Sequence, residues 1–300
     1  MSTLTEKKLF ALLRLLGNRD ASTRALAEKS LAEMGPSVIH QLRAVSDKVS
    51  PKDAKRLEEL AFVVPRRPHL SDLATLVESG GDAVDLEAGL WCLARFRDPE
   101  LATTLYTREL ERISEAIRAK VGKHPTSYHL LQTFIQVVFD EEGFRGNEDD
   151  YYDPDNSFLH KVLERRRGIP ISLSALCILL GHRLEVPIAG VGLPGHFICR
   201  FGEGEQVVYF DPFNGGRAMT REGCAVLCQQ MGVTFSEDYL IPYTNREILI
   251  RMVRNLREIF IQREALLDLG VLDDYLRVLL RDDTLMSAYD EPLDEEVSGD

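Results

Sequence analysis

Residues 165–200 read RRRGIPISLSALCILLGHRLEVPIAGVGLPGHFICR, and the fold is built around this stretch. Gly168-Ile-Pro170 predicts the start of a helix, because proline fits the first helical turn. The apolar run that follows continues through Leu184 and stops before Val186-Pro187, where a helix cannot continue. One buried helix is therefore expected between Pro170 and Leu184.

Two antiparallel strands are expected after this helix. Residues 188–201 contain strand-forming side chains interrupted by Pro194-Gly195, which predicts a turn or bulge immediately before His196. The second strand, residues 206–210, leads to Asp211. A buried helix followed by strands that carry first a histidine and then an acid is the order found in papain-like cysteine enzymes. In these enzymes the helix start activates a thiol, the histidine takes its proton and the acid orients the histidine.

Several motifs in this order resemble those of transglutaminase-core proteins of the bacterial SirB family. The resemblance runs from about Leu70 to about Ile259 and is most specific from Phe144 to Gly216. It implies an α+β fold with a transglutaminase-like, papain-like core, and it does not imply an established activity. The motifs are Asp153-Pro-Asp-Asn-Ser157, Val162-Leu-Glu-Arg-Arg-Arg-Gly-Ile-Pro170, Pro187, Pro194-Gly-His-Phe197 and Asp211-Pro-Phe-Asn-Gly215.

The chain departs from active members of this fold at the nucleophile. Counting back from Val186-Pro187, the cysteine expected at the helix start falls at or near Pro170, where no cysteine is present. Cys177 shares this helix face but lies about 10 Å further along it, at 1.5 Å per residue. In such an apolar run the pKa of a thiol is raised, so Cys177 is expected to be inert.

His196 and Asp211 are the candidate remnant of a catalytic site. As a pair, they would fix the imidazole tautomer through Nδ1 and could serve a binding cleft as well as catalysis. Ser172, in the first turn of the helix, is the only replacement nucleophile. A serine there more usually satisfies the terminal backbone N–H groups. Cys199 lies three residues past His196, so it should face the opposite side of the strand.

The polar segment before this helix supplies the candidate cleft residues Asn156, Arg166 and Pro170. Asn156-Ser157 is predicted to cap a helix from Phe158 to Arg166. The three consecutive arginines allow two interpretations. They could pair with acids of the preceding loop or with their own helix carbonyls, which is the preferred interpretation. Alternatively, they could bind an anionic ligand beside the free N–H groups at Pro170.

Composition excludes several classes of function. The net charge of −12 over 300 residues argues against direct nucleic-acid binding, which requires clustered Lys and Arg. The five scattered cysteines indicate reduced thiols. Cys224 and Cys228 share a helix face, but no nearby ligands complete a metal site, so no metal and no cofactor is expected. No apolar segment suits a signal peptide or a membrane helix, which predicts a cytoplasmic location.

Four regions are expected along the chain. Residues 1–66 form a HEAT-like module, since their loop-Arg-helix-Gly-Pro-helix pattern resembles that repeat. Residues 67–243 form the transglutaminase-like core, with a helical subdomain over 67–140 and the core proper over 141–243. Residues 244–281 form a C-terminal helical pair, with a long helix from Asn245 to Leu269 and a shorter one from Asp273 to Arg281. The family commonly continues here with tetratricopeptide-like helices. The acidic tail, residues 282–300, is predicted to be disordered.

The sequence favours a non-catalytic function, a pseudoenzyme that acts as a protein-interaction or regulatory module. The protein partner is not identified, no membrane partner is expected, and the sequence does not define the oligomeric state. One alternative is a hydrolase or acyltransferase that uses a site of Ser172, His196 and Asp211. Another alternative is a purely structural subunit.

Overall fold

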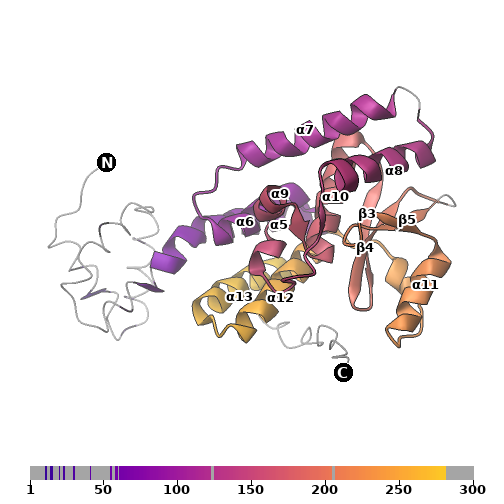
Figure 1. The fold of residues 1–300 in the computed structure, drawn as a ribbon. Helices are drawn as coiled ribbons and strands as arrows, with labels where there is room; N and C mark the ends of the chain where they lie inside the picture. Colours follow the sequence, from indigo (N-terminus) through magenta and orange to yellow (C-terminus); the bar gives the residue numbers. More distant parts are fainter. Residues whose placement is uncertain are drawn as a thin grey trace.

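The computed structural model of the chain describes residues 61–122, 125–204 and 207–281, together with a few isolated residues before position 61. Most of the predicted HEAT-like module and the whole of the predicted acidic tail lie outside the described residues. The described part is α+β, with helices in the majority and two small sheets (Figure 1). This architecture agrees with the predicted fold class.

A run of helices precedes the sheet. Aspartate and threonine begin two of them in the expected way, because Asp85 accepts a hydrogen bond from the backbone N–H of Ala88 and Thr126 accepts one from that of His129. In this part of the chain the helices are η2 (Val64–Arg66), α5 (Arg67–Gly80), η3 (Gly81–Ala83), α6 (Leu86–Arg97), α7 (Thr104–Val121), α8 (Ser127–Ile135) and the π-helical segment η4 (Gln136–Glu141).

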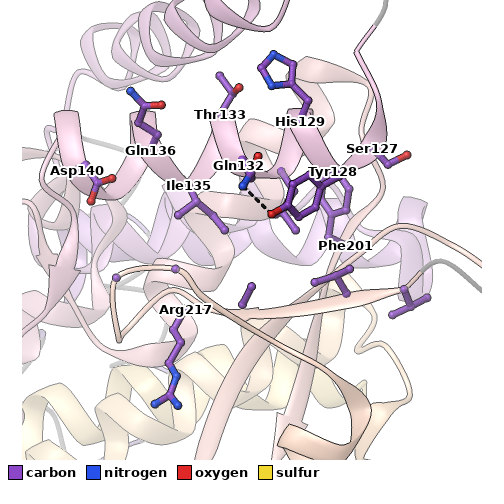
Figure 2. Close-up of a pocket in the computed structure, with 16 residues that line it drawn as sticks. Ser127, Tyr128, His129, Gln132, Thr133, Ile135, Gln136, Asp140, Phe201 and Arg217 are labelled. Atoms are coloured by element: carbon purple, nitrogen blue, oxygen red, sulfur yellow. Dashed lines mark hydrogen bonds between the residues drawn. The ribbon is translucent and has the colours of Figure 1, made fainter.

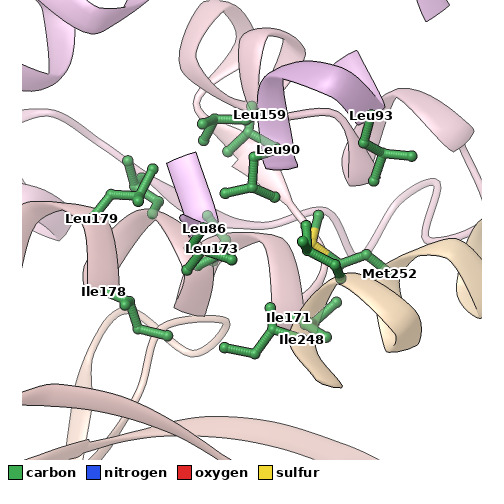
Figure 3. Close-up of a cluster of buried hydrophobic side chains, with 14 of the residues drawn as sticks. Leu86, Leu90, Leu93, Leu159, Ile171, Leu173, Ile178, Leu179, Ile248 and Met252 are labelled. Atoms are coloured by element: carbon green, nitrogen blue, oxygen red, sulfur yellow. The ribbon is translucent and has the colours of Figure 1, made fainter. Parts of the chain in front are cut away.

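The central helix α10 (Pro170–Leu184) has the bounds that the sequence predicts. Its last turn ends at Glu185, which is left-handed with a φ of 57°, and Pro187 follows. Apolar side chains from three other helices surround it, as Figure 3 shows (Leu86, Leu90 and Leu93 of α6, Leu159 of α9 (Leu159–Arg165), and Ile248 and Met252 of α12 (Asn245–Gln262)). The position of α10 at the centre of the core explains why its run of apolar residues is nearly continuous.

The main sheet is antiparallel, with the strand order β3-β4-β5-β6. Its first two strands form a hairpin, so that Pro194-Gly195, predicted as a turn or bulge, is a turn in which Gly195 has a φ of 64°. A smaller parallel pair, β1 with β2, lies just before α10. The strands are β1 (Arg145–Gly146), β2 (Arg167–Gly168), β3 (Ile188–Leu193), β4 (His196–Phe201), β5 (Val208–Asp211) and β6 (Arg217–Met219).

The two faces of the main sheet have different helical partners. Phe197 and Cys199 of β4 belong to the large core cluster built around α10. Ile198 belongs to a second cluster, which contains Cys224 and Cys228 of α11 (Arg221–Gln230). This alternation confirms that Cys199 faces away from the side of the strand that carries His196.

The C-terminal helices differ from the prediction in one respect. A single helix was expected from Asn245 to Leu269, but α12 ends at Gln262 and α13 (Leu266–Leu280) begins after a short break. Glu264 in this break has a φ of 53°, which a continuous helix cannot contain. The apolar pattern continues across the break because both helices contribute to the same core, so periodicity alone did not reveal it.

Candidate functional site

The sheet brings His196 and Asp211 together. His196 is the first residue of β4 and Asp211 is the last residue of β5, and the antiparallel register pairs Cys199 with Phe210. The two side chains therefore lie on the same face at the same end of the sheet. Nε2 of His196 lies 2.7 Å from Oδ2 of Asp211. The predicted pair is formed, but through Nε2, so the expectation that Nδ1 would make this contact was wrong.

Asp211 is held as a carboxylate by the turn that follows it. Its Oδ1 accepts hydrogen bonds from the backbone N–H groups of Phe213 at 3.0 Å and Asn214 at 3.2 Å, and its Oδ2 accepts one from Nδ2 of Asn214 at 2.7 Å. Burial by itself would raise the pKa of Asp211, but the hydrogen bonds from His196 and Asn214 lower that pKa below its usual range. A carboxylate can only accept hydrogen bonds, so Nε2 of His196 donates.

The other imidazole nitrogen, Nδ1, makes no hydrogen bond to any residue within the described ranges. The side chain of His196 is 20% exposed, and the ring of Phe213 packs edge-on against it at a centroid distance of 6.4 Å. When the imidazole is neutral, the proton on Nε2 leaves a lone pair on Nδ1. The site therefore offers one oriented hydrogen-bond acceptor.

The start of α10 does not offer a nucleophile to this acceptor. Oγ of Ser172 donates to the backbone carbonyl of Asn156 at 2.6 Å and accepts from the backbone N–H of Ile169 at 3.1 Å. Ser172 is only 1% exposed, and Pro170 beside it is also buried. In the described part of the chain, Ser172 is not a hydrogen-bond partner of His196. Its hydroxyl has the role that serines commonly have at helix starts.

The cysteine thiols are also unsuited to act as nucleophiles. All five cysteines are unpaired and buried. Burial raises the pKa of the Cys177 thiol well above its ordinary value, and the neighbouring Cys199 raises it further. A protonated thiol inside an apolar core is a poor nucleophile, as the sequence predicted for Cys177.

Asn156 is a structural residue of the loop before α9. It is fully buried, and its Nδ2 donates to the backbone carbonyls of Asp150 at 2.7 Å and Tyr151 at 3.2 Å. Its Oδ1 accepts from Nδ2 of Asn147 at 2.9 Å. The prediction that Asn156-Ser157 caps α9 was wrong, because Phe158 occupies the cap position without a side-chain bond. The amide of Asn156 instead holds the 3-10 helix η5 (Pro154–Ser157) against the acidic loop.

Arg166 is engaged by acids rather than open to a ligand. It ends α9 in a left-handed conformation with a φ of 55°, and its guanidinium bonds to Glu109 and, at 3.2 Å, to Glu142. The guanidinium also stacks over the ring of Phe144, 4.5 Å from the centroid. Its neighbour Arg165 pairs with the loop acid Asp153 at 2.6 Å. The contacts of Arg165 and Arg166 agree with the preferred interpretation, in which these side chains pair with acids of the preceding loop or with carbonyls of their own helix.

The sequence did not reveal a groove of about 890 Å³ between α8 and the β5–β6 end of the sheet (Figure 2). The signal that could have indicated it is the presence of the small residues Gly215, Gly216 and Ala218 at the end of the Asp211 motif and directly after it. Its lining residues come from α8, from η4 and from the edge of the sheet, and they include Tyr128, Gln132, Ile135, Gln136, Asp140, Phe201, Val208, Gly216, Arg217 and Ala218.

Among the described residues, no group of three or more His, Cys, Asp and Glu side chains is arranged to hold a metal ion. No helix in this part of the chain combines the length and the apolar content needed to span a membrane.

Comparison with known proteins identifies relatives of the chain. The family model described as transglutaminase-like superfamily matches residues 104–254. A UPF0162 protein of Xylella fastidiosa is 33% identical over 199 residues, which cover 64% of this chain and 70% of that protein. A UPF0162 protein of Vibrio cholerae is 31% identical over 144 residues, covering 48% and 53%. F-box only protein 21 of Homo sapiens is 36% identical over 136 residues, which are 42% of this chain and 21% of that protein. No solved structure matches the chain significantly.

Proposed function

The chain belongs to the transglutaminase-like superfamily, and on that premise we propose that it is a non-catalytic member that binds another protein. The observation that carries this proposal is the occupied start of α10. The hydroxyl of Ser172 is bound to the carbonyl of Asn156 and is buried, and the chain has Pro170 at or near the position where a cysteine is expected. A nucleophile must lie within about 3 Å of the base that activates it, and Ser172 is committed elsewhere.

In this proposal the pair of His196 and Asp211 serves recognition. Asp211 fixes the orientation of the imidazole, so that Nδ1 presents its lone pair at the partly exposed end of the sheet. A backbone N–H or a hydroxyl of a bound partner can donate to this nitrogen. Because the acceptor is held by a buried carboxylate, it loses little freedom on binding.

The same proposal covers the subfamily, the domains and the location of the protein. We place the chain with the SirB group because its Pro-Gly-His-Phe and Asp-Pro-Phe-Asn-Gly motifs lie at the turn before β4 and at the end of β5. We assign residues 1–66 to a HEAT-like extension that adds a second protein-binding surface, followed by a core over 67–243 and a helical pair over 244–281. A cytoplasmic location is proposed because all five thiols are unpaired.

A second candidate, a hydrolase or acyltransferase, is favoured by one observation. The carboxylate of Asp211 holds His196 in an orientation that would suit a general base. For catalysis, Ser172 would have to leave its bonds to Asn156 and Ile169 and become exposed. The two candidates therefore differ in whether the imidazole is needed for turnover.

An activity comparison separates them. Three proteins are tested with nitrophenyl esters and with glutamine peptides plus an amine: the full chain, His196→Ala and His182→Ala. His182→Ala is the matched control, because it changes an exposed histidine at the end of α10. We expect no turnover by the full chain above that of His196→Ala. Turnover that is lost in His196→Ala but kept in His182→Ala would establish the enzyme and overturn the proposal.

A further inference from the structure

The main sheet has one covered edge and one open edge. At the covered edge, Val191 of β3 forms a bridge with Pro242, and the backbone N–H of Tyr243 donates to the carbonyl of Gly190 at 2.9 Å. At the other edge, β6 pairs only with β5 among the described residues. An unpaired strand edge presents backbone donors and acceptors that another strand can satisfy.

The groove between α8 and the sheet lies next to this open edge. Ala218 of β6 is opposite Phe210 of β5, and the ring of Phe210 packs edge-on against Phe134 of α8 at 6.0 Å. Ala218 therefore faces α8. Because its side chain is a single methyl group, it leaves open the space that Ile135 and the exposed Gln136 line from above (Figure 2).

The opposite side of β6 carries an unpaired positive charge. Arg217 is exposed and makes no ion pair within the described residues. In Figure 2 its side chain points away from α8, although the residue also contributes to the lining of the groove. Met219, two residues further on, packs against the second core cluster on that same side. The edge strand thus presents an apolar hollow on one side and a cation on the other.

We propose that β6 binds an extended segment of a partner protein as an added strand, with an apolar side chain in the α8 groove and an acidic side chain beside Arg217. Successive residues of a strand point to opposite faces, so the segment carries the apolar and the acidic residue at neighbouring positions. Backbone hydrogen bonds to β6 supply affinity, and the groove and Arg217 supply selectivity.

The adjoining π-helical segment η4 supports this assignment. Its residues Gln136 and Asp140 line the groove, and Gly216 of the sheet edge approaches it so closely that an added Cβ would lie 2.4 Å from Phe139. Segments of π-helix are rare and occur frequently at functional sites. Here η4 and the close approach of Gly216 hold one wall of the groove at a fixed distance from the strand.

This inference rests on the proposed protein-binding function, but its test is separate, because the groove does not include His196. A displayed library of random linear peptides of about ten residues is selected against the full chain, and enriched peptides are synthesised for affinity measurements. We expect enriched sequences in which apolar and acidic residues are neighbours. Binding should also slow amide hydrogen exchange in β6.

Three variants locate the binding. Ala218→Leu fills the groove and should weaken binding at least about tenfold, and Arg217→Glu should weaken it most at low salt. Met219→Leu, on the same strand but on the other side, should leave the affinity within about twofold. If Ala218→Leu does not fold, the peptide affinity of Arg217→Glu, a change at an exposed position, tests the proposal by itself.

Three outcomes would overturn the proposal. They are an absence of enriched peptides, equal affinities in all variants, and self-association of the chain that Ala218→Leu abolishes, which would place a second copy at the edge. A catalytic result with His196→Ala would leave the conclusion about the groove unaffected.

Discussion

The hydrogen bonds of the Ser172 hydroxyl explain why the start of α10 does not supply a nucleophile. The hydroxyl oxygen joins η5 to the start of α10, since it bonds to the carbonyl of Asn156, the N–H of Ile169 and, at 3.1 Å, the carbonyl of Ile169. Gly168 lies against it so closely that an added Cβ would be 2.7 Å from the hydroxyl. The hydroxyl is thus part of the packing between η5 and α10.

We expect Ser172→Ala to lower the free energy of unfolding by about 1–3 kcal/mol, because it leaves a buried carbonyl and a buried N–H without their partner. Urea unfolding of the full chain measures this change. Ser174→Ala is the matched control. Its hydroxyl is equally buried but makes one bond of 3.5 Å to the carbonyl of Phe197, so its loss should cost less. Equal costs for the two variants would contradict the role assigned to Ser172.

At the scale of elements, the end of α9 is joined to α7 and to the segment after η4 by charge. Arg166 binds Glu109 of α7 and Glu142, and Arg112 of α7 binds the same two acids. Hydrogen bonds from Arg112, opposed by burial, lower the pKa of Glu109 to about 2. This network, together with the stacking on Phe144, fixes the path of the chain from α9 into β2 and the start of α10.

Arg166→Ala should therefore destabilise the protein by about 2 kcal/mol, since it removes charge-assisted bonds from a half-buried network. Arg165→Ala, the neighbouring control, removes mainly one exposed ion pair with Asp153 and should cost less than about 1 kcal/mol. Thermal unfolding of both variants at neutral pH provides the comparison. If Arg165→Ala were the more damaging change, the network would not be what positions α9.

At the scale of the whole molecule, a buried histidine makes stability depend on pH. His160 of α9 is fully buried, and its Nε2 lies 2.7 Å from Oδ2 of Asp98 at the end of α6. Its Nδ1 is buried without a partner among the described residues. Burial lowers the pKa of His160 below 6.5, although the hydrogen bond to Asp98 opposes this. Lys161 also faces Asp98, and the ring of Tyr106 packs against the imidazole.

The direction of this pH dependence follows from the number of protons that the folded and the unfolded chain bind. Below the ordinary histidine pKa of 6.5 the unfolded chain binds a proton at His160 before the folded chain does, so stability should fall as the pH falls. Urea unfolding between about pH 7 and pH 5 should show this loss, and His160→Asn should flatten it. The exposed His129→Asn should keep the dependence of the full chain. An unchanged slope in His160→Asn would exclude His160 as its source.

Much of this protein is determined by local sequence. Helix starts, proline stops and alternation predict the bounds of α10, a turn or bulge at Pro194-Gly195 and the position of Asp211 at a strand end. These signals act over a few residues, so they can be read without knowledge of what lies nearby in space. The absence of a cysteine at the start of α10 is also visible in the sequence alone.

The tertiary structure decided which atoms meet. Only the sheet register brings His196 beside Asp211, and only the orientation of the imidazole shows that the contact is through Nε2. Only the packing of η5 on α10 shows that Ser172 is bound to Asn156. The groove arises where Ala218 faces α8, across a separation of more than 80 residues in sequence. Hydrogen-bond partners and hollows depend on groups that are distant in sequence, and local propensity contains no information about their distances.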